Sequence, residues 1–273
     1  MNRAAEYAEN GFLVERGLYS ADEASALVDA FMAMHAQGGV EGRYSTPPPD
    51  QDHDDMFHHV FKQGDPLLRY PRVMWPHMFL PEARASVLKA GVFDLLEEVL
   101  GEEVLSVSSM FYFKPPQARG QAFHQDNYYI RVKPGTCIGV WVACDPSDEA
   151  NGALQVVPGS QEMEIVCPEI SDPANYFAKE LVRPPAGLTP ELPRMDPGDA
   201  LIFHGNLIHG SEPNRSPDRF RKSMVCHYMP ISSVELGKLD GHAPLLDRHG
   251  REHHLGEVAG GGPCGTPHES VLH

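Results

Sequence analysis

The chain has 273 residues, 41% of them hydrophobic and 22% charged, which is the composition of an ordinary globular protein. Acidic residues outnumber basic residues by 38 to 22, and the formal net charge is −16. This balance argues against a nucleic-acid-binding protein, which needs a basic patch, and against adhesion to an anionic membrane surface.

The N-terminal part, residues 1–103, carries the helical signals of the chain. Residues 11–15 are typical of a short strand. Ser20 and Glu23 then have the spacing of a capping box, and apolar residues follow at helical spacing. The chain starts with no apolar run typical of a secretory signal, and no run approaches the roughly 18 apolar residues of a membrane span. We therefore expect a cytoplasmic protein.

A long loop and a second helix complete this part. Residues 38–66 are rich in Gly, Pro, Asp and His, which predicts a loop. A helix is predicted over Val92–Leu100, with Gly101 as its C-cap. At the other end of the chain, residues 233–273 have weak periodicity and are expected to form an irregular tail.

Short strands dominate from residue 104 onward, where β-prone runs alternate with turns rich in Gly and Pro. The runs are Val104–Phe113, Cys137–Cys144, Ala153–Val157, Asp199–His204 and Lys222–Met229. Repeated short strands of this kind predict a mainly β protein with flanking helices, folded as a double-stranded β-helix, a jelly-roll or cupin-like barrel. Because no internal repeat divides the chain, residues 1–273 are predicted to form a single domain with a jelly-roll core over 104–232.

The cysteines indicate a reducing compartment. They are Cys137, Cys144, Cys167, Cys226 and Cys264. Their number is odd and none has C-x-x-C spacing, so we expect buried, reduced thiols rather than a disulfide framework or a zinc ribbon.

A His-x-Asp pair has the residue types of a metal centre. On a strand, the side chains of His124 and Asp126 would point to the same face. The third ligand must come from a distant strand: His209, before a tight Gly-Ser turn, is the better candidate, and His204 is its rival. Two histidines and one carboxylate hold non-heme Fe(II) on one face and leave three positions open. With Arg221 downstream to bind a carboxylate of a cosubstrate, the pattern predicts an iron oxygenase.

Further motifs surround these residues in a fixed order. They are Glu9-Asn10-Gly11-Phe12, Lys114-Pro115-Pro116, Gly139-Val140-Trp141-Val142-Ala143, Asn151-Gly152-Ala153-Leu154, Val157-Pro158-Gly159-Ser160, His209-Gly210-Ser211 and Phe220-Arg221-Lys222. The combination resembles the phytanoyl-CoA dioxygenase superfamily of Fe(II)/2-oxoglutarate-dependent oxygenases over residues 5–232. The resemblance implies that His124, Asp126 and His209 bind iron. It also implies Fe(II), 2-oxoglutarate as cosubstrate, and O₂ in a hydroxylase that releases succinate and CO₂.

The same resemblance assigns a cosubstrate pocket. Arg221 matches the arginine that binds the distal carboxylate of 2-oxoglutarate, supported by Ser211. Arg219 is a rival, because the preceding Ser-Pro-Asp loop leaves two alignments open. Trp141 and Met110 match positions that line the pocket, and both also fit ordinary core positions on strands.

The sequence says little about the substrate, which is expected to be a small metabolite with an unactivated C–H bond. Asn127, Tyr128 and Tyr129 follow the ligand pair, and Tyr128 shares the strand parity of Asp126. These three residues are candidates for the substrate site, with ordinary strand packing as the alternative. Trp75, from the N-terminal part, is a candidate to fold over the mouth.

Two other classes of function use the same residues. A metal-dependent cupin-type hydrolase or isomerase would activate water on the metal but leaves Arg221 and Ser211 unexplained. A non-catalytic barrel that binds a small molecule does not need a complete ligand set. The presence of Asp126 favours hydroxylation, desaturation or demethylation over halogenation. The sequence does not indicate an oligomeric state.

Overall fold

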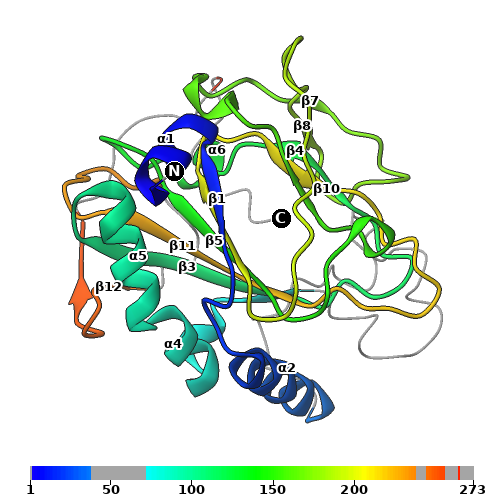
Figure 1. Ribbon diagram of the computed structural model, residues 1–273, viewed down its shortest axis with the longest axis horizontal. Helices are drawn as coiled ribbons and strands as arrows, with labels where there is room; N and C mark the ends of the chain where they lie inside the picture. Colours follow the sequence, from blue (N-terminus) through cyan, green and yellow to red (C-terminus); the bar gives the residue numbers. More distant parts are fainter. Residues whose placement is uncertain (1, 38–71, 238–243, 256–263, 265–273) are drawn as a thin grey trace.

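A computed structural model describes residues 2–37, 72–237, 244–255 and Cys264, and consists mainly of antiparallel strands (Figure 1). The strands are β1 (Phe12–Glu15), β2 (Arg72–Met74), β3 (Val104–Tyr112), β4 (Gln121–His124), β5 (Ile138–Ala143), β6 (Leu154–Val156), β7 (Glu169–Ile170), β8 (Glu180–Leu181), β9 (Ala200–His204), β10 (His209–Ser211), β11 (Ser223–Pro230), β12 (Leu245–Leu246) and β13 (Glu252–His253). The loop predicted over 38–66 lies outside the described residues.

Two sheets face each other and frame the site. The larger sheet has the strand order β1-β9-β5-β11-β3-β12-β13, with β2 also paired to β3. The smaller sheet has the order β4-β10-β6, and β7 and β8 form a separate pair. Because the chain alternates between the two main sheets from β3 to β6 and from β9 to β11, motifs distant in the sequence meet between them. This is the double-stranded β-helix architecture predicted from the sequence.

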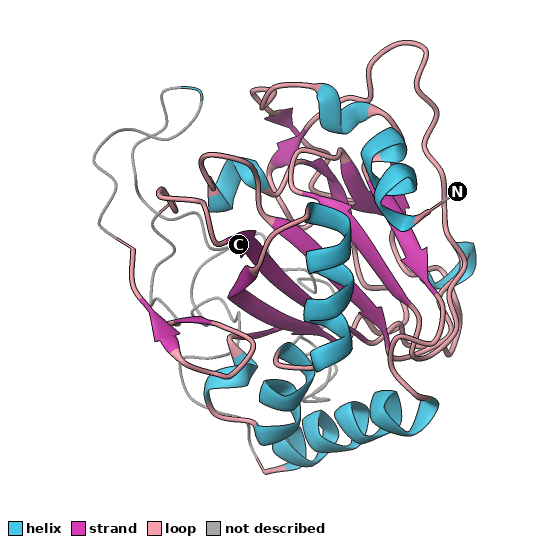
Figure 2. Ribbon diagram, turned by 60° about the vertical axis from the view of Figure 1, so that its left-hand side comes forward, coloured by secondary structure: helices cyan, strands magenta, loops and turns pink. Residues whose placement is uncertain are grey.

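Helices α1 (Arg3–Asn10), α2 (Ala21–Ala36), α4 (Pro81–Val87) and α5 (Ala90–Leu100) pack in one buried cluster with side chains of the larger sheet. The short helix α6 (Asn127–Ile130) lies at the site cavity instead, and the 3₁₀ turns are η2 (Pro76–Met78), η3 (Glu149–Asn151) and η4 (Ser160–Glu162). Figure 2 shows α2, α4 and α5 against this sheet. Within the described ranges, the structure contains no helix long and apolar enough to cross a membrane.

Strand alternation separates the core from the site. On β11, the side chains of Met224, Cys226 and Tyr228 pack with the helices in one buried cluster. Val225 belongs to a second cluster between the two sheets, and His227 shares its parity. The period of two thus directs one set of side chains into the helix-covered core and the other toward the smaller sheet.

The predicted capping signals are confirmed. Ser20 Oγ accepts a hydrogen bond from the Glu23 amide, and the Glu23 carboxylate accepts one from the Ser20 amide, which is a complete capping box at the start of α2. The second predicted helix is α5, which ends at Gly101 with φ +77°, a conformation that favours glycine.

The predicted strands also appear, with no bound shifted by more than one residue, but other elements were missed. The sequence analysis did not identify α1, α4 or the short strands β2 and β10 as regular elements. The prediction of an irregular tail over residues 233–273 is wrong for its described part, where β12 and β13 form a hairpin that extends the larger sheet beyond β3. Strands of two residues carry too few side chains to show a period.

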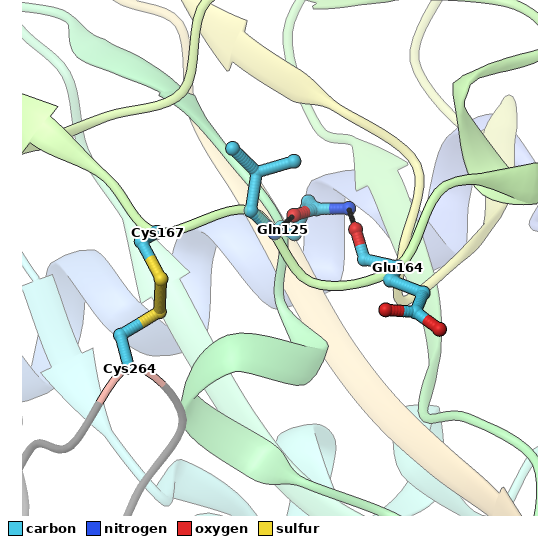
Figure 3. The surroundings of a disulfide bond; sticks show 5 residues. Gln125, Glu164, Cys167 and Cys264 are labelled. Atoms are coloured by element: carbon cyan, nitrogen blue, oxygen red, sulfur yellow. Dashed lines mark hydrogen bonds between the residues drawn. A yellow bond between two sulfur atoms is a disulfide. The ribbon is translucent and has the colours of Figure 1, made fainter.

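One prediction about the cysteines is wrong. Cys137, Cys144 and Cys226 are buried free thiols, as expected, but Cys167 and Cys264 form a disulfide across 97 residues of sequence (Figure 3). Spacing did not show this pair, because the tertiary fold alone brings two such distant residues together.

Candidate active site

The three predicted metal ligands converge between the two sheets. His124 ends β4 and His209 begins β10, and the two residues are paired across these antiparallel strands. Asp126 Oδ1 lies 3.4 Å from His124 Nε2 and 3.5 Å from His209 Nε2. One ligand atom from each of the three residues lies within 4.8 Å of the others, an arrangement able to hold a metal ion. His204, the rival candidate, is outside this group.

The route by which Asp126 reaches the site differs from the prediction. Strand β4 ends at His124, and Asp126 is the N-cap residue of α6 with α-helical φ and ψ. The expectation that both residues share a strand face is therefore wrong. The carboxylate reaches the histidines because the chain turns into α6 directly after the strand.

Gln125, between the two ligands, fixes this turn by bonding away from the site. Its Nε2 donates to the carbonyl of Glu164 at 3.3 Å (Figure 3). The same Nε2 donates to the carbonyl of Asn206 at 2.9 Å, and Oε1 accepts a hydrogen bond of 2.8 Å from the backbone amide of Val166. Neighbouring side chains thus point in opposite directions, toward the metal centre and toward a supporting loop.

Backbone carbonyls orient both histidine rings. His124 Nδ1 lies 2.9 Å from the carbonyl oxygen of Ala122, and His209 Nδ1 lies 2.9 Å from that of Leu207. Because a carbonyl only accepts, Nδ1 carries the proton and donates in each ring. The unprotonated Nε2 of each ring then lies on the side of Asp126, and that of His124 accepts a hydrogen bond of 3.0 Å from the side-chain amide of Gln121. This is the tautomer that a metal requires.

Asp126 is buried but remains ionised. Burial by itself raises the pKa of this carboxyl, but the neighbouring His209 and His227 outweigh that effect and hold the pKa well below its usual value. An ionised carboxylate with two neutral imidazole nitrogens is a donor set that suits a first-row divalent metal such as Fe(II).

Arg221 lines the same cavity and carries an unsatisfied donor. Its side chain is buried, with Nη1 donating to Ser223 Oγ at 2.8 Å and the guanidinium carbon 5.2 Å from the centre of the Trp141 ring. Burial lowers the pKa of Arg221 to about 10, so the group stays charged at neutral pH. Its Nε has no hydrogen-bond partner among the described residues. A buried guanidinium with a free donor fits a carboxylate ligand.

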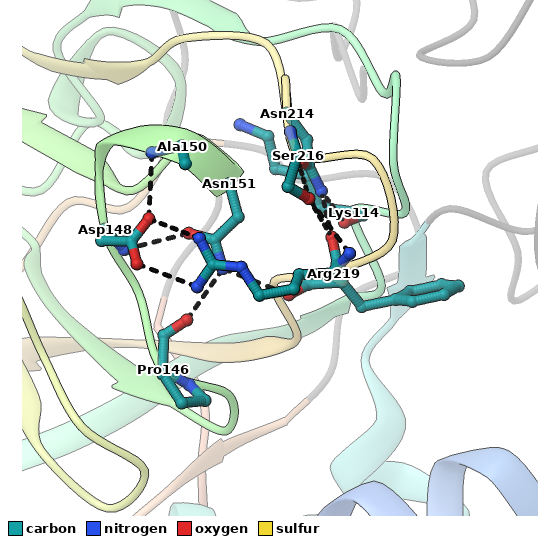
Figure 4. A network of polar contacts seen from close by, with 9 residues as sticks. Lys114, Pro146, Asp148, Ala150, Asn151, Asn214, Ser216 and Arg219 are labelled. Carbon is teal, nitrogen blue, oxygen red and sulfur yellow. Dashed lines mark hydrogen bonds and ion pairs between the residues drawn. The ribbon is translucent and has the colours of Figure 1, made fainter.

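Arg219 is held elsewhere. Its two Nη atoms each donate to Asp148 at 2.8 Å in a bidentate pair at the surface (Figure 4). The side-chain nitrogen Nδ2 of Asn214 donates to the backbone carbonyls of both Arg219 and Lys114, which fixes the loop before Arg221. The structure therefore favours Arg221 over Arg219 as the residue that faces a cosubstrate.

Ser211 lines the cavity, and its hydroxyl oxygen serves as a hydrogen-bond acceptor within the fold. Lys114 Nζ donates to Ser211 Oγ at 2.9 Å and to the carbonyls of Gly152 and Glu212 at 3.0 and 2.6 Å. Because the lysine only donates, the hydroxyl proton of Ser211 is left for another acceptor. Lys114 appeared in the sequence only as part of a Lys-Pro-Pro motif, and its role in supporting the site was missed.

Trp141 and Met110 also line the cavity, from β5 and β3 respectively. Trp141 belongs to the buried cluster between the sheets as well, so its pocket and core roles coincide.

The three substrate candidates lie in different surroundings. Tyr129 lines the cavity, with its ring centre 6.2 Å from that of His124, and Trp75 lines it from the N-terminal part. Asn127 Oδ1 instead accepts hydrogen bonds from the amides of Val132 and Cys137. Tyr128 lies outside the cavity lining and packs edge-on against Tyr129.

The parity argument for Tyr128 is wrong because the residue belongs to α6 and not to a strand. Within α6, only the third of the three candidates turns its side chain toward the metal ligands.

His227 is a site residue that the sequence analysis missed. Its Nε2 lies 2.8 Å from Asp126 Oδ2, and its ring is buried in the same cavity. The available signal was a histidine in an otherwise apolar strand, Ser223–Pro230, at the parity of Val225. Nothing near His227 in the sequence points to the residue it bonds to, because Asp126 precedes it by 101 residues.

Comparisons with known proteins agree with this geometry. The family model described as phytanoyl-CoA dioxygenase (PhyH) matches residues 7–223. A phytanoyl-CoA dioxygenase 1 of Oryza sativa is 27% identical over 254 residues, which span 84% of this chain and 88% of that protein. A probable alpha-ketoglutarate-dependent hypophosphite dioxygenase of Stutzerimonas stutzeri is 25% identical over 230 residues, covering 81% of this chain and 75% of that protein.

Solved structures show the same fold. The epimerase SnoN, in complex with Fe³⁺, alpha ketoglutarate and nogalamycin RO, has a TM-score of 0.65 and 18% identity, covering 94% of each chain. EctD from S. alaskensis, with 2-oxoglutarate and 5-hydroxyectoine, has a TM-score of 0.62 and 22% identity, covering 85% of this chain and 77% of that chain.

Proposed function

The chain belongs to the phytanoyl-CoA dioxygenase family and is an Fe(II)- and 2-oxoglutarate-dependent oxygenase, and on this premise we propose that it hydroxylates an unactivated C–H bond of a small metabolite. Succinate and CO₂ are the products formed from the cosubstrate. The observation that carries the proposal is the placement of His124, Asp126, His209 and the partly unsatisfied Arg221 around one cavity.

The residues have separate tasks in the proposal. His124, Asp126 and His209 would hold Fe(II), to which 2-oxoglutarate and O₂ would bind. When bound, the metal and its cosubstrate supply the oxidising power needed to break a C–H bond. Arg221 and the hydroxyl of Ser211 bind the distal carboxylate of 2-oxoglutarate, because both residues line the cavity and each has a donor without a partner among the described residues.

The walls of the cavity exclude water and select the substrate. Trp141 and Met110 line the cosubstrate part, where Trp141 packs against the guanidinium of Arg221. Tyr129 and Trp75 line the cavity without any role in holding the metal, and we assign them to the substrate part. Asn127 and Tyr128 are left with structural roles in α6.

The alternatives considered from the sequence are not favoured. A cupin-type hydrolase or isomerase would use the metal centre but gives no task to a buried arginine whose Nε lacks a partner among the described residues. A non-catalytic barrel gives no reason for two histidines whose Nδ1 atoms are both bonded to backbone carbonyls, so that both unprotonated Nε2 atoms lie beside the Asp126 carboxylate.

The proposal is tested by anaerobic addition of Fe(II) and 2-oxoglutarate to the apoprotein. A weak visible charge-transfer band is expected when the cosubstrate binds to the iron. Succinate release in air, screened over candidate metabolites with formation of a hydroxylated product, then identifies the substrate. Folded, metal-loaded protein that neither develops the band nor forms succinate would refute the proposal.

A further inference from the structure

His227 connects the metal centre to the larger sheet. The residue lies on β11, and its ring is only 2% exposed. Nε2 is 2.8 Å from Asp126 Oδ2, and Nδ1 is 3.1 Å from Ser108 Oγ. Ser108 on β3, His227 on β11 and the carboxylate of Asp126 are thus connected by two successive hydrogen bonds.

We propose that His227, oriented by Ser108, is a positioning residue that holds Asp126 as a one-oxygen metal ligand. The inference rests on the proposed function, because it assigns a task within the metal centre described above. It concerns the binding of the metal itself and goes beyond the assignment of the three ligands.

The direction of each hydrogen bond follows from the partners. An ionised carboxylate only accepts, so Nε2 of His227 carries a proton and donates to Asp126 Oδ2. In the neutral ring, Nδ1 then accepts the hydroxyl proton of Ser108, which selects this tautomer. Asp126 Oδ1 is left facing the Nε2 atoms of His124 and His209 at 3.4 and 3.5 Å.

The sheet gives His227 little room to move. Ser108 is its paired residue on β3, and Gly139 is its paired residue on β5. A Cβ on Gly139 would lie 2.1 Å from Cζ of Phe203, so the Phe203 ring occupies the place of that side chain. The same ring lies 4.5 Å from that of His209, centre to centre. Ser108, His227 and Phe203 thus form one packed layer behind the ligands.

The geometry has a consequence for the coordination number. A carboxylate that binds through one oxygen leaves three positions of an octahedral site open, and 2-oxoglutarate and O₂ need all three. If both oxygens of Asp126 turned to the metal, one of these positions would be lost. The bond from His227 to Oδ2 opposes that rotation.

The experiment measures metal affinity without turnover. Apoprotein is titrated anaerobically with Fe(II), and with Co(II) as a redox-stable probe, for wild type and for His227→Leu, His227→Gln, His227→Asn and Ser108→Ala. His227→Leu, which has no donor, is expected to bind metal about 10- to 100-fold more weakly. His227→Gln, whose amide nitrogen reaches the position of Nε2, should recover most of the affinity, whereas the shorter Asn should not. Ser108→Ala should have a smaller effect.

The controls separate positioning from folding and from the proposed function. His204→Leu removes a partly buried histidine outside the metal group and should leave the affinity unchanged. Thermal unfolding of each apoprotein reports loss of structure. If His227→Leu does not fold, the inference is tested by the difference in metal affinity between His227→Gln and His227→Asn. Wild-type affinity in His227→Leu, or equal affinity in Gln and Asn, would overturn the inference. A wild-type protein that binds metal but shows no 2-oxoglutarate band would instead count against the proposed function.

Discussion

Arg219 and Arg221 are two residues apart in the chain and lie in opposite surroundings. Arg219 forms a bidentate pair with Asp148 at the surface, and its side chain is 42% exposed. Arg221 is buried over the Trp141 ring, with Nε lacking a partner in the described part of the chain. Of these two arginines, Arg221 is the one that is buried and lines the cavity.

Replacing Arg221 should therefore weaken cosubstrate binding. A hydrogen bond to a charged group contributes about 1.5–3 kcal/mol, which corresponds to an increase of about 10- to 150-fold in the KM for 2-oxoglutarate in Arg221→Ala. Initial rates of succinate formation against 2-oxoglutarate concentration measure this. Arg219→Ala is the matched control and should leave the KM within about twofold, because its partner lies at the surface. The reverse result would assign the cosubstrate to Arg219.

Removing the carboxylate of the metal centre should abolish turnover without unfolding the protein. In Asp126→Ala, the two histidines alone hold the metal, and His227 loses its acceptor. We expect loss of stoichiometric Fe(II) binding and of succinate formation, with an unchanged circular dichroism spectrum in the far ultraviolet. Full succinate formation by this variant would show that Asp126 is not a ligand.

The two candidate histidines provide a second matched pair. His209→Ala removes a ring whose Nδ1 is fixed by a backbone carbonyl and whose Nε2 faces Asp126. His204→Ala removes a ring whose Nδ1 accepts from the amide of Asn206 at 3.1 Å. Metal content measured after reconstitution should fall in the first variant and stay at the wild-type level in the second. Equal metal content in the two variants would contradict the ligand assignment.

Lys114 should affect the cosubstrate through Ser211. Lys114→Met leaves the carbonyls of Gly152 and Glu212 without their donor, which should destabilise the fold by about 1–3 kcal/mol. The same change frees the Ser211 hydroxyl to rotate, so the KM for 2-oxoglutarate should rise several-fold. Ser211→Ala should raise the KM similarly with little loss of stability. In the double variant the two effects on KM should not add, and full additivity would show that Lys114 acts by another route.

Asp199 should contribute to the dependence of stability on pH. Its carboxylate accepts from Arg16 Nη1 at 2.6 Å and from the amides of Gly17 and Asp196 at 2.9 and 3.0 Å. Burial by itself raises the pKa of Asp199, but these bonds outweigh it and lower the pKa. The folded pKa is then below the unfolded value of about 3.9, so the stabilisation is present above that pH and lost as pH falls through the folded pKa.

Asp199→Asn should consequently be less stable than wild type at pH 7. The difference between the two proteins should shrink as the pH is lowered below about 4, because the wild-type carboxyl becomes protonated there. Urea denaturation of both proteins at pH 7 and at about pH 3 measures it. A difference that stays constant over this range would show that the charge of Asp199 does not contribute.

Local signals in the sequence were sufficient for much of the fold. The capping box at Ser20 and the C-cap at Gly101 involve residues within one helical turn of the ends that they define, so composition and spacing predict them. Strands β1, β3, β5, β9 and β11 of the larger sheet are long enough to show as β-prone runs. Strands β10 and β12, with three and two residues, depend on their partners and left no such signal.

The sequence by itself determined the chemistry of this protein: the types and order of His124, Asp126, His209 and Arg221 predict an iron- and 2-oxoglutarate-dependent oxygenase on a double-stranded β-helix. Only the tertiary structure decided which arginine faces the cavity and that Cys167 pairs with Cys264. It also decided that His227 bonds to Asp126. The physical reason is that ligand type is a property of single side chains. Burial, hydrogen-bond partners and tautomers depend instead on residues that the sheets bring together from distant parts of the chain.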